Sequence, residues 1–161
     1  MSGSDTSVPQ LPPSLLDDIF AHAAAGYPRE VCGLISGEPG KLEEVRRCDN
    51  RQDALHAEDP VTFPRDSRTA YNIGARDLLY LAKSLKSPKP VQVIYHSHVD
   101  VGAYFSSEDK AAATSEGELL YPVDYLVVDA GPSGVRGAKL FRFTGGDFVE
   151  VAAYSQRKDN G

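Results

Sequence analysis

The sequence of 161 residues predicts a single domain with an α/β fold, in which helices flank a mixed β-sheet. Two observations support this prediction. Short apolar stretches typical of strands are mixed with stretches in which apolar residues recur at helical spacing. These stretches do not follow the regular strand–helix–strand order of a purely parallel sheet, and we therefore expect strands of both orientations in one sheet.

The folded part of the chain is expected to begin with a helix and a β-hairpin. Apolar residues recur with helical period over residues 15–23, where Ser14 is the predicted N-cap and Gly26-Tyr27-Pro28 ends the helix. Residues 30–37 and 41–48 are predicted strands, and the Pro-Gly dipeptide between them is typical of a turn.

The middle of the chain is predicted to contain a long loop and a second helix. Residues 49–70 are polar and hold two prolines, which favours a loop with a short strand near residues 61–63. Residues 71–73 are a predicted short strand. The amphipathic pattern of residues 75–85 predicts a helix, which Ser87-Pro88 ends.

The remaining elements complete the predicted sheet, with residues 91–97 as its core strand. After this strand we expect a loop at 99–105, a helix at 106–118, a strand at 122–129, a turn at 131–134, and strands at 135–143 and 147–153.

The two ends of the chain are expected to lie outside the domain. Residues 14–154 form the predicted domain, between a flexible Pro-rich tail at 1–13 and a C-terminal tail at 155–161. The first residues have neither the basic nor the apolar region of a secretory signal, and no apolar run approaches the roughly 18 residues of a membrane span. We therefore expect a cytoplasmic protein that does not bind membranes.

Composition excludes some partners. The net charge of −6 and an isoelectric point near 5.2 argue against nucleic acid, because phosphate binding requires clustered Lys and Arg. Cys32 and Cys48 fit no zinc-ribbon or redox spacing and are predicted to be buried thiols.

Two histidines and one carboxylate form the most informative pattern. His96 lies near the end of the predicted core strand and His98 directly follows it, and Asp109 stands eleven residues after His98, at a predicted helix start. Residues two apart on a strand point the same way, so both rings can face one metal ion. Zinc in hydrolases usually takes three His, Asp or Glu ligands and leaves a fourth position for water. The pattern therefore predicts a catalytic zinc site.

Each half of this pattern also has a structural interpretation. Isolated histidines on strands are usually core or surface residues. Ser106 followed three residues later by Asp109 resembles a capping box, worth about 1 kcal/mol, and the carboxylate can complement the helix dipole. These interpretations account for the two halves separately, but not for their separation by a short Gly-containing loop.

The complete pattern resembles a known family. His96-x-His98, seven residues, then Ser106-x-x-Asp109 matches the motif of the JAMM metalloproteases, also called the MPN-plus or Mov34/PAD-1 group. The family motif includes an upstream glutamate, and Glu30 stands where it is expected, after the first helix. The chain is similar to prokaryotic single-domain members over nearly all of its expected folded part. This resemblance implies the MPN fold, which is similar to that of cytidine deaminases.

The resemblance also implies roles for the matching residues. His96, His98 and Asp109 would bind Zn²⁺, Glu30 would act as general base and then pass the proton to the leaving amine, and Ser106 would donate a hydrogen bond to the oxyanion. These roles are chemically coherent. Zinc lowers the pKa of bound water to about 7, a positioned carboxylate contributes typically 10²–10⁴-fold, and an oxyanion donor is worth roughly 3 kcal/mol.

The implied substrate is a ubiquitin-like or sulfur-carrier protein, cut after its C-terminal Gly-Gly. Residues 110–122 leave no room for a large insertion after the motif, as in prokaryotic members, which act on sulfur carriers. The tail would add as a strand beside a sheet edge, and residues 49–70 are a candidate clamp. The choice between peptide and isopeptide bonds, the partner and the oligomeric state stay open.

Two features depart from the commonest family pattern. Val99 and Asp100 follow the second histidine, where proline is frequent, and the loop at 99–105 is unusually apolar. Tyr104 and Phe105 in this loop either line a peptide groove or pack in the core. These departures concern substrate specificity.

Alternative functions differ in the residues that they require. A non-catalytic MPN scaffold would have lost ligands, whereas all five motif positions are present. A zinc deaminase requires H-x-E together with P-C-x-x-C, and P-C-x-x-C does not occur in the sequence. A metal-dependent amidohydrolase of a small molecule stays open, because the same water attack serves any amide carbonyl.

Overall fold

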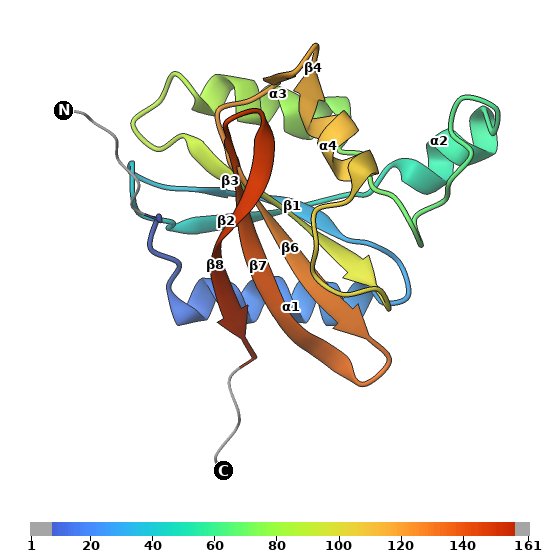
Figure 1. The fold of residues 1–161 in the computed structure, drawn as a ribbon, viewed down its shortest axis with the longest axis horizontal. Helices are drawn as coiled ribbons and strands as arrows, with labels where there is room; N and C mark the ends of the chain where they lie inside the picture. The colour runs from blue at the N-terminus through green and yellow to red at the C-terminus, as the bar shows by residue number, and fades with distance from the viewer. Residues whose placement is uncertain (1–7, 157–161) are drawn as a thin grey trace.

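A six-stranded mixed sheet forms the centre of the computed structural model, which describes residues 8–156 (Figure 1). The strands of this sheet are β1 (Cys32–Ser36), β2 (Glu44–Cys48), β3 (Val91–Val99), β6 (Asp124–Gly131), β7 (Gly134–Thr144) and β8 (Asp147–Ser155). The helices are α1 (Pro13–Gly26), α2 (Gln52–Glu58), α3 (Ala75–Ser84) and α4 (Ser107–Ala113). The strand order is β2-β1-β3-β6-β7-β8, and β3 and β6 are parallel whereas the other neighbours are antiparallel. The predicted fold class is confirmed.

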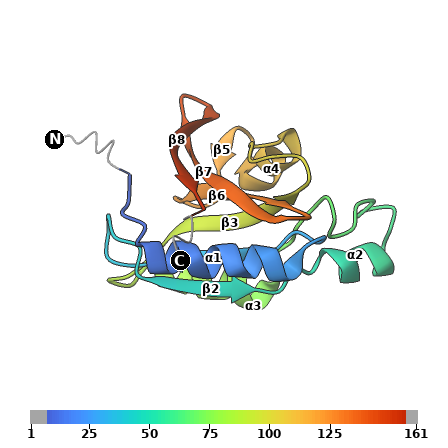
Figure 2. The same ribbon diagram turned by 90° about the horizontal axis from the view of Figure 1, so that it is seen from below.

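Helix α1 covers one face of the sheet (Figures 1 and 2). Its residues Ile19 and Ala23 are fully buried in a core cluster with Tyr95 of β3 and Leu126 of β6. The helix is the one predicted over residues 15–23, but it starts earlier than expected.

Ser14 is not the N-cap of α1, contrary to the prediction. Pro12 occupies that position, without a side-chain hydrogen bond, and Pro13 is the first helical residue. Proline at this position loses no hydrogen bond, and its fixed φ suits the helix. Two prolines therefore start the helix without a polar cap.

Helices α3 and α4 cover the opposite face. A second core cluster contains Leu81 of α3, Ala113 of α4, Ile94 of β3 and Tyr125 of β6. Since successive strand residues point to opposite faces, Ile94 faces α3 and α4 while Tyr95 faces α1. This alternation along β3 determines where the next side chains of the strand point.

The predicted long loop at 49–70 contains helix α2, and residues 61–63 form no strand. The buried residue of this helix is the polar Gln52. Its sequence therefore lacks the apolar periodicity by which a helix is usually predicted. Polar contacts fold the segment back instead: the Gln52 side-chain amide donates to the Arg65 carbonyl at 2.8 Å, and the Asp53 carboxylate accepts from the Ser67 backbone N–H at 2.8 Å. The helix projects from one end of the molecule (Figure 2).

The helix predicted at 106–118 ends at Ala113. The chain continues into a small hairpin of β4 (Thr114–Ser115) and β5 (Glu118–Leu119). Its two-residue turn has positive φ at both positions, 53° at Glu116 and 83° at Gly117. Two-residue hairpin loops favour this conformation, which a continuing helix cannot adopt.

The described part of the expected N-terminal tail lies against the domain. Gln10 forms a β-bridge with Lys41, and Val8 and Leu11 pack against the core cluster under α1. Residues 1–7 and 157–161, which make up most of the two predicted tails, lie outside the described residues.

Within residues 8–156, the helices are all too short or too polar to cross a membrane.

Replacement of Gly33 by alanine is expected to lower the free energy of unfolding by about 1–3 kcal/mol. A Cβ atom there would stand 2.2 Å from Tyr95 Cε2, and this ring is fully buried with its hydroxyl hydrogen-bonded to His22 at 2.6 Å. Equilibrium urea unfolding measures the change. The control Gly74→Ala meets the flexible Arg51 side chain at 3.2 Å and should cost less than about 1 kcal/mol. Equal losses in the two variants would contradict this packing.

Candidate metal centre

Strand β3 brings two histidines to one face of the sheet. His96 and His98 lie two and four residues after Ile94, so both rings point toward α3 and α4. Strand β3 lies between β1 and β6, in the middle of the sheet. His96 is therefore 0% exposed and His98 is 4% exposed. Their ring centroids are 5.1 Å apart.

The first turn of α4 positions the carboxylate. Ser106 is the N-cap: its hydroxyl oxygen accepts from the Asp109 backbone N–H at 3.0 Å, and Asp109 Oδ2 accepts from the Ser106 backbone N–H at 3.0 Å. The capping box suggested by the sequence is therefore present. It coexists with the third candidate ligand, because the same carboxylate faces the histidines.

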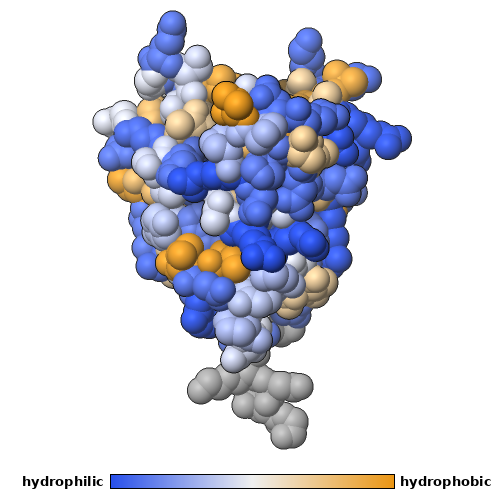
Figure 3. Space-filling view, turned by 90° about the vertical axis from the view of Figure 1, so that its right-hand side faces the viewer, coloured by the Kyte–Doolittle hydropathy of each residue, from blue (hydrophilic) through white to orange (hydrophobic). Residues whose placement is uncertain are grey.

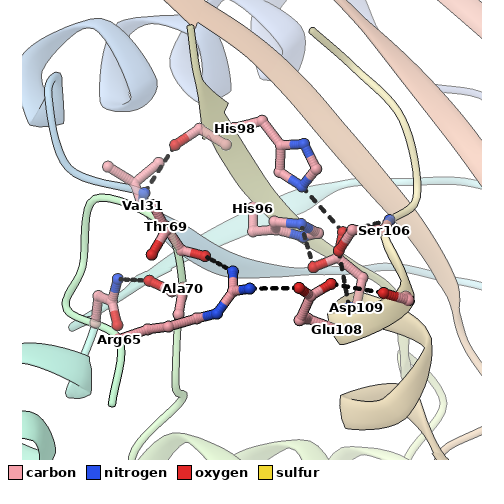
Figure 4. A network of polar contacts seen from close by, with 12 residues as sticks. Val31, Arg65, Thr69, Ala70, His96, His98, Ser106, Glu108 and Asp109 are labelled. Carbon is pink, nitrogen blue, oxygen red and sulfur yellow. Dashed lines mark hydrogen bonds and ion pairs between the residues drawn. The ribbon is translucent and has the colours of Figure 1, made fainter. Parts of the chain in front are cut away.

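The three side chains converge on one point (Figure 4). Asp109 Oδ2 lies 2.9 Å from His98 Nε2, and Asp109 Oδ1 lies 3.2 Å from His96 Nε2. One donor atom from each residue can be chosen so that all lie within 4.8 Å of one another. Two imidazole nitrogens and one carboxylate oxygen are the donors of an open, three-ligand zinc site.

His96 provides the test of whether a metal ion fits. The ring is fully buried, and neither of its nitrogens makes a hydrogen bond of good geometry among residues 8–156; Nε2 only approaches Asp109 Oδ1, at 3.2 Å. Buried polar atoms are normally hydrogen-bonded, so this arrangement requires an explanation. A cation bound at Nε2 beside Asp109 would satisfy this nitrogen, so the residues fit a metal ion.

Neighbouring groups orient the two rings. His98 Nδ1 lies 3.2 Å from the Gly102 carbonyl oxygen, and donation to this carbonyl leaves Nε2 with its lone pair toward Asp109. Such partners commonly fix the tautomer of metal-binding histidines. His96 stacks on Tyr71, with ring centroids 4.3 Å apart and planes 19° apart.

The protonation states suit metal binding. Burial lowers the pKa of His96, which keeps the imidazole neutral. Burial acts to raise the pKa of Asp109, but the attraction and polar contacts of His96 and His98 outweigh it and hold this pKa well below its ordinary value. Neutral imidazoles and an ionised carboxylate are the forms that metal ions bind.

Glu30 lies two residues before β1, rather than on the strand as predicted. Its backbone N–H donates to the Ser67 carbonyl at 2.6 Å, and its carbonyl accepts from the Asn50 side-chain amide at 2.9 Å. Asn50 also donates to the Ala70 carbonyl at 3.1 Å. These bonds explain how a residue outside the sheet ladder has a fixed position.

The Glu30 side chain is buried and its acidity is weakened. Burial raises the pKa of this carboxyl to about 9, and the negative charge of Asp109 adds to the shift. In the metal-free protein Glu30 is therefore protonated at neutral pH. A nearby cation would favour its ionised form.

A cavity of about 180 Å³ joins these groups. Glu30, His98, Ser106 and Asp109 all line it. Ser106 accepts one hydrogen bond through its hydroxyl oxygen as the helix cap, and its own hydroxyl hydrogen stays available to donate. The surface at this end of the molecule is mainly hydrophilic, with separate hydrophobic patches (Figure 3).

A larger cavity lies elsewhere. It has a volume of about 570 Å³ between the ends of β1 and β2 and helix α3, and none of the five motif residues lines it. Glu43 and Lys89, an ion pair at 3.7 Å, are on its wall. The smaller cavity is the functional candidate because it contains the titratable and metal-binding groups.

Two other side chains near the motif do not join the site. Asp100 points away, and both its carboxylate oxygens accept from the Tyr27 hydroxyl at 3.0 Å. Cys32 and Cys48 are register partners on β1 and β2, and both are buried free thiols, as predicted. Burial raises the pKa of both thiols, that of Cys48 to about 12, which makes them poor nucleophiles.

Some residues of the cavity were missed by the sequence analysis. They belong to residues 64–69, which we call the arginine segment, and to the start of α4: Arg65, Arg68, Thr69 and Glu108. In the sequence, the arginine segment was indicated only by the length and polarity of the predicted loop at 49–70. Asn50 and Tyr71 carried no recognisable spacing.

The sequence matches the family described as prokaryotic homologs of the JAB domain over residues 12–142. It is 30% identical over 101 residues to the CysO-cysteine peptidase of Mycobacterium tuberculosis strain H37Rv and, equally, to that of Mycobacterium bovis. Each match covers 62% of this chain and 62% of the relative, so the chain spans less than two thirds of the length of these curated relatives.

Solved structures support the fold. A protein from Desulfitobacterium hafniense superposes with a TM-score of 0.59 at 22% identity, covering 86% of each chain. A protein from Salinibacter ruber superposes with a TM-score of 0.58 at 23% identity, covering 90% of each chain.

Metal-stripped protein given one equivalent of zinc is expected to retain about one zinc ion, and Asp109→Asn should lose it. The amide preserves the helix cap but removes the charge, and even changes to groups that only hydrogen-bond to a metal ligand cost about 10- to 100-fold in metal affinity. Metal analysis after gel filtration measures retention. Asp100→Asn, which lies near His98 but points away, is the matched control and should behave like the wild type. Equal retention by Asp109→Asn would reject these ligands.

The free energy of unfolding of the metal-free protein should fall with rising pH more steeply than that of Glu30→Gln. The folded pKa of Glu30 is about 9 and its ordinary value is 4.5, so between them the unfolded chain has lost a proton that the folded chain keeps. This stabilisation is complete below about pH 4.5 and is lost toward pH 9, at most about 1.4 kcal/mol per unit. Urea unfolding of both proteins at about pH 5 to 8 measures this pH dependence. If the free energies of unfolding of the wild type and of Glu30→Gln change with pH in parallel, the carboxyl of Glu30 is not buried in its protonated form.

Proposed function

Because the chain belongs to the family of prokaryotic homologs of the JAB domain, we propose that it is a zinc-dependent peptidase or isopeptidase. Its substrate would be a ubiquitin-like or sulfur-carrier protein, cut after the C-terminal Gly-Gly. The observation that carries this proposal is the convergence of the buried His96, His98 and Asp109 side chains, with Glu30 and Ser106 at the cavity that His98 and Asp109 also line.

His96, His98 and Asp109 would hold the metal ion. Zinc bound there would supply a Lewis acid for the scissile carbonyl and lower the pKa of the attacking water to about 7. The residues of the chain would supply the proton transfers and the positioning. A bound cation would lower the pKa of Glu30 from about 9 toward the working pH, where a general base is most effective.

Glu30 would take a proton from the attacking water and give it to the leaving amine. The Ser106 hydroxyl would donate a hydrogen bond to the carbonyl oxygen as negative charge develops on it. The reciprocal cap with Asp109 fixes the Ser106 hydroxyl before substrate arrives, so little reorganisation is needed.

The name of the mycobacterial relatives supports a carrier protein as substrate. A Gly-Gly tail has no side chains to recognise. Backbone hydrogen bonds and contacts with the arginine segment would therefore bind it. A substrate of this kind would place the enzyme in the cytoplasm, without nucleic acid or membrane as a partner.

A small-molecule amidohydrolase is the second candidate. The cavity of about 180 Å³ would restrict such a substrate to a small amide, since this volume lies below the about 300–1,000 Å³ of most ligand sites. The presence of all three candidate ligands disfavours a non-catalytic scaffold. Parallel assays on a carrier protein and on small amides separate these functions.

Glu30→Gln is expected to keep zinc but to lower cleavage by about 10²–10⁴-fold, because the amide cannot accept the proton. The substrate is a carrier protein ending in Gly-Gly and one further residue, and mass spectrometry follows the loss of that residue. Glu43→Gln, remote from the site, is the control. Wild-type turnover by zinc-loaded Glu30→Gln would reject the mechanism.

A further inference from the structure

The cavity at the candidate site has two unlike walls. Its apolar wall consists of Val99 at the end of β3 and of Val101 and Tyr104 in the loop that follows, and its cationic wall consists of Arg65, Arg68 and Thr69 from the arginine segment. Val101 is 61% exposed and Tyr104 is 49% exposed, so both are accessible to a substrate. The asymmetry implies that the two walls contact chemically different parts of it.

Arg65 is already engaged within the protein. Its guanidinium forms an ion pair with Glu108 of α4 and donates to the Thr69 carbonyl at 3.4 Å (Figure 4). These contacts tie the arginine segment to the first turn of α4. Arg65 therefore shapes the wall, and its charge is largely balanced by Glu108.

Arg68 is different. Its side chain is exposed and makes no hydrogen bond or ion pair within the part of the chain that the structure describes. Its backbone is nevertheless fixed, because its N–H donates to the Asp66 carboxylate at 3.0 Å and the preceding Ser67 is buried. The result is an available guanidinium on an anchored backbone at the edge of the cavity.

The cationic wall lies on the side of Glu30. The Glu30 backbone N–H donates to the Ser67 carbonyl at 2.6 Å, and Arg68 is the next residue along the chain. A base that returns its proton to the leaving amine must face the leaving group. The arginine segment therefore adjoins the part of the cavity that the leaving group would occupy.

We propose that Arg68 binds the free α-carboxylate of a single C-terminal residue released from behind Gly-Gly. This inference rests on the proposed function. In such a residue the carboxylate is separated from the leaving nitrogen by one carbon atom, so it must lie close to Glu30. An isopeptide bond to a lysine side chain places no carboxylate there. A guanidinium is suited to this task because it binds a carboxylate through two parallel hydrogen bonds.

The small volume of the cavity agrees with this assignment. About 180 Å³ admits a single residue more readily than a folded second protein. The protein would thus act as a carboxypeptidase that restores the Gly-Gly terminus of a carrier. It hydrolyses one amide bond, and water supplies the new carboxylate of the carrier and the protons of the released amine.

The test compares a labelled peptide ending in Gly-Gly-Ala as the free acid with the same peptide as the C-terminal amide. Binding to the zinc-loaded Glu30→Gln protein is measured by fluorescence anisotropy, and cleavage by the wild type is measured as kcat/KM. Hydrogen bonds to a charged group imply a preference for the acid of about 10- to 100-fold in binding. Arg68→Gln should abolish this preference without changing the affinity for the amide.

The control is Arg76→Gln, an exposed arginine on α3, which should keep the preference. Arg68→Lys should retain part of it. If the acid and the amide bind equally, or if Arg68→Gln weakens both equally, the assignment of Arg68 is overturned. If the acid is preferred through Arg68 but no peptide or carrier is cleaved by the wild type, the assignment stands and the proposed peptidase function is the part that fails.

Discussion

Asp109 Oδ2 accepts the Ser106 backbone N–H at 3.0 Å and lies 2.9 Å from His98, while Asp109 Oδ1 lies 3.2 Å from His96. One carboxylate therefore caps α4 and faces both rings of β3. The hydrogen bond from the Ser106 backbone N–H fixes the orientation of the Asp109 carboxylate. This orientation determines which carboxylate oxygen lies next to each imidazole ring. The helix start and the candidate metal centre therefore share one carboxylate.

A second polar junction holds the other half of the site. The Asn50 side chain donates to the Glu30 and Ala70 carbonyls, and its oxygen accepts from the backbone N–H groups of Gln52 and Asn72. This uses the full hydrogen-bonding capacity of one amide. It replaces a β-ladder at the point where the chain leaves the sheet, which is why Glu30 is well placed outside a strand.

The sequence allowed the sheet, α1, α3 and the grouping of His96, His98 and Asp109 to be predicted, because apolar periodicity and motif spacing are local signals. Helix α2 was missed because polar contacts, such as that of Gln52 with Arg65, replace an apolar face. The end of α4 was misplaced because the turn at Glu116 depends on backbone conformation. The sequence did not single out Arg68, because a surface arginine has no distinctive pattern. Only the fold shows that Arg68 lines the same cavity as Glu30.

The hydrogen bond from the Glu30 backbone N–H to the Ser67 carbonyl has a consequence for how the proposed site can change during evolution. The segment that would select the leaving group also anchors the residue assigned to proton transfer. Insertion or deletion between residues 64 and 69 would displace both, whereas exchange of a side chain at Arg68 would leave the anchor intact. New preferences can therefore arise here by point substitution at constant loop length, and changes in loop length would cost turnover before they altered selectivity.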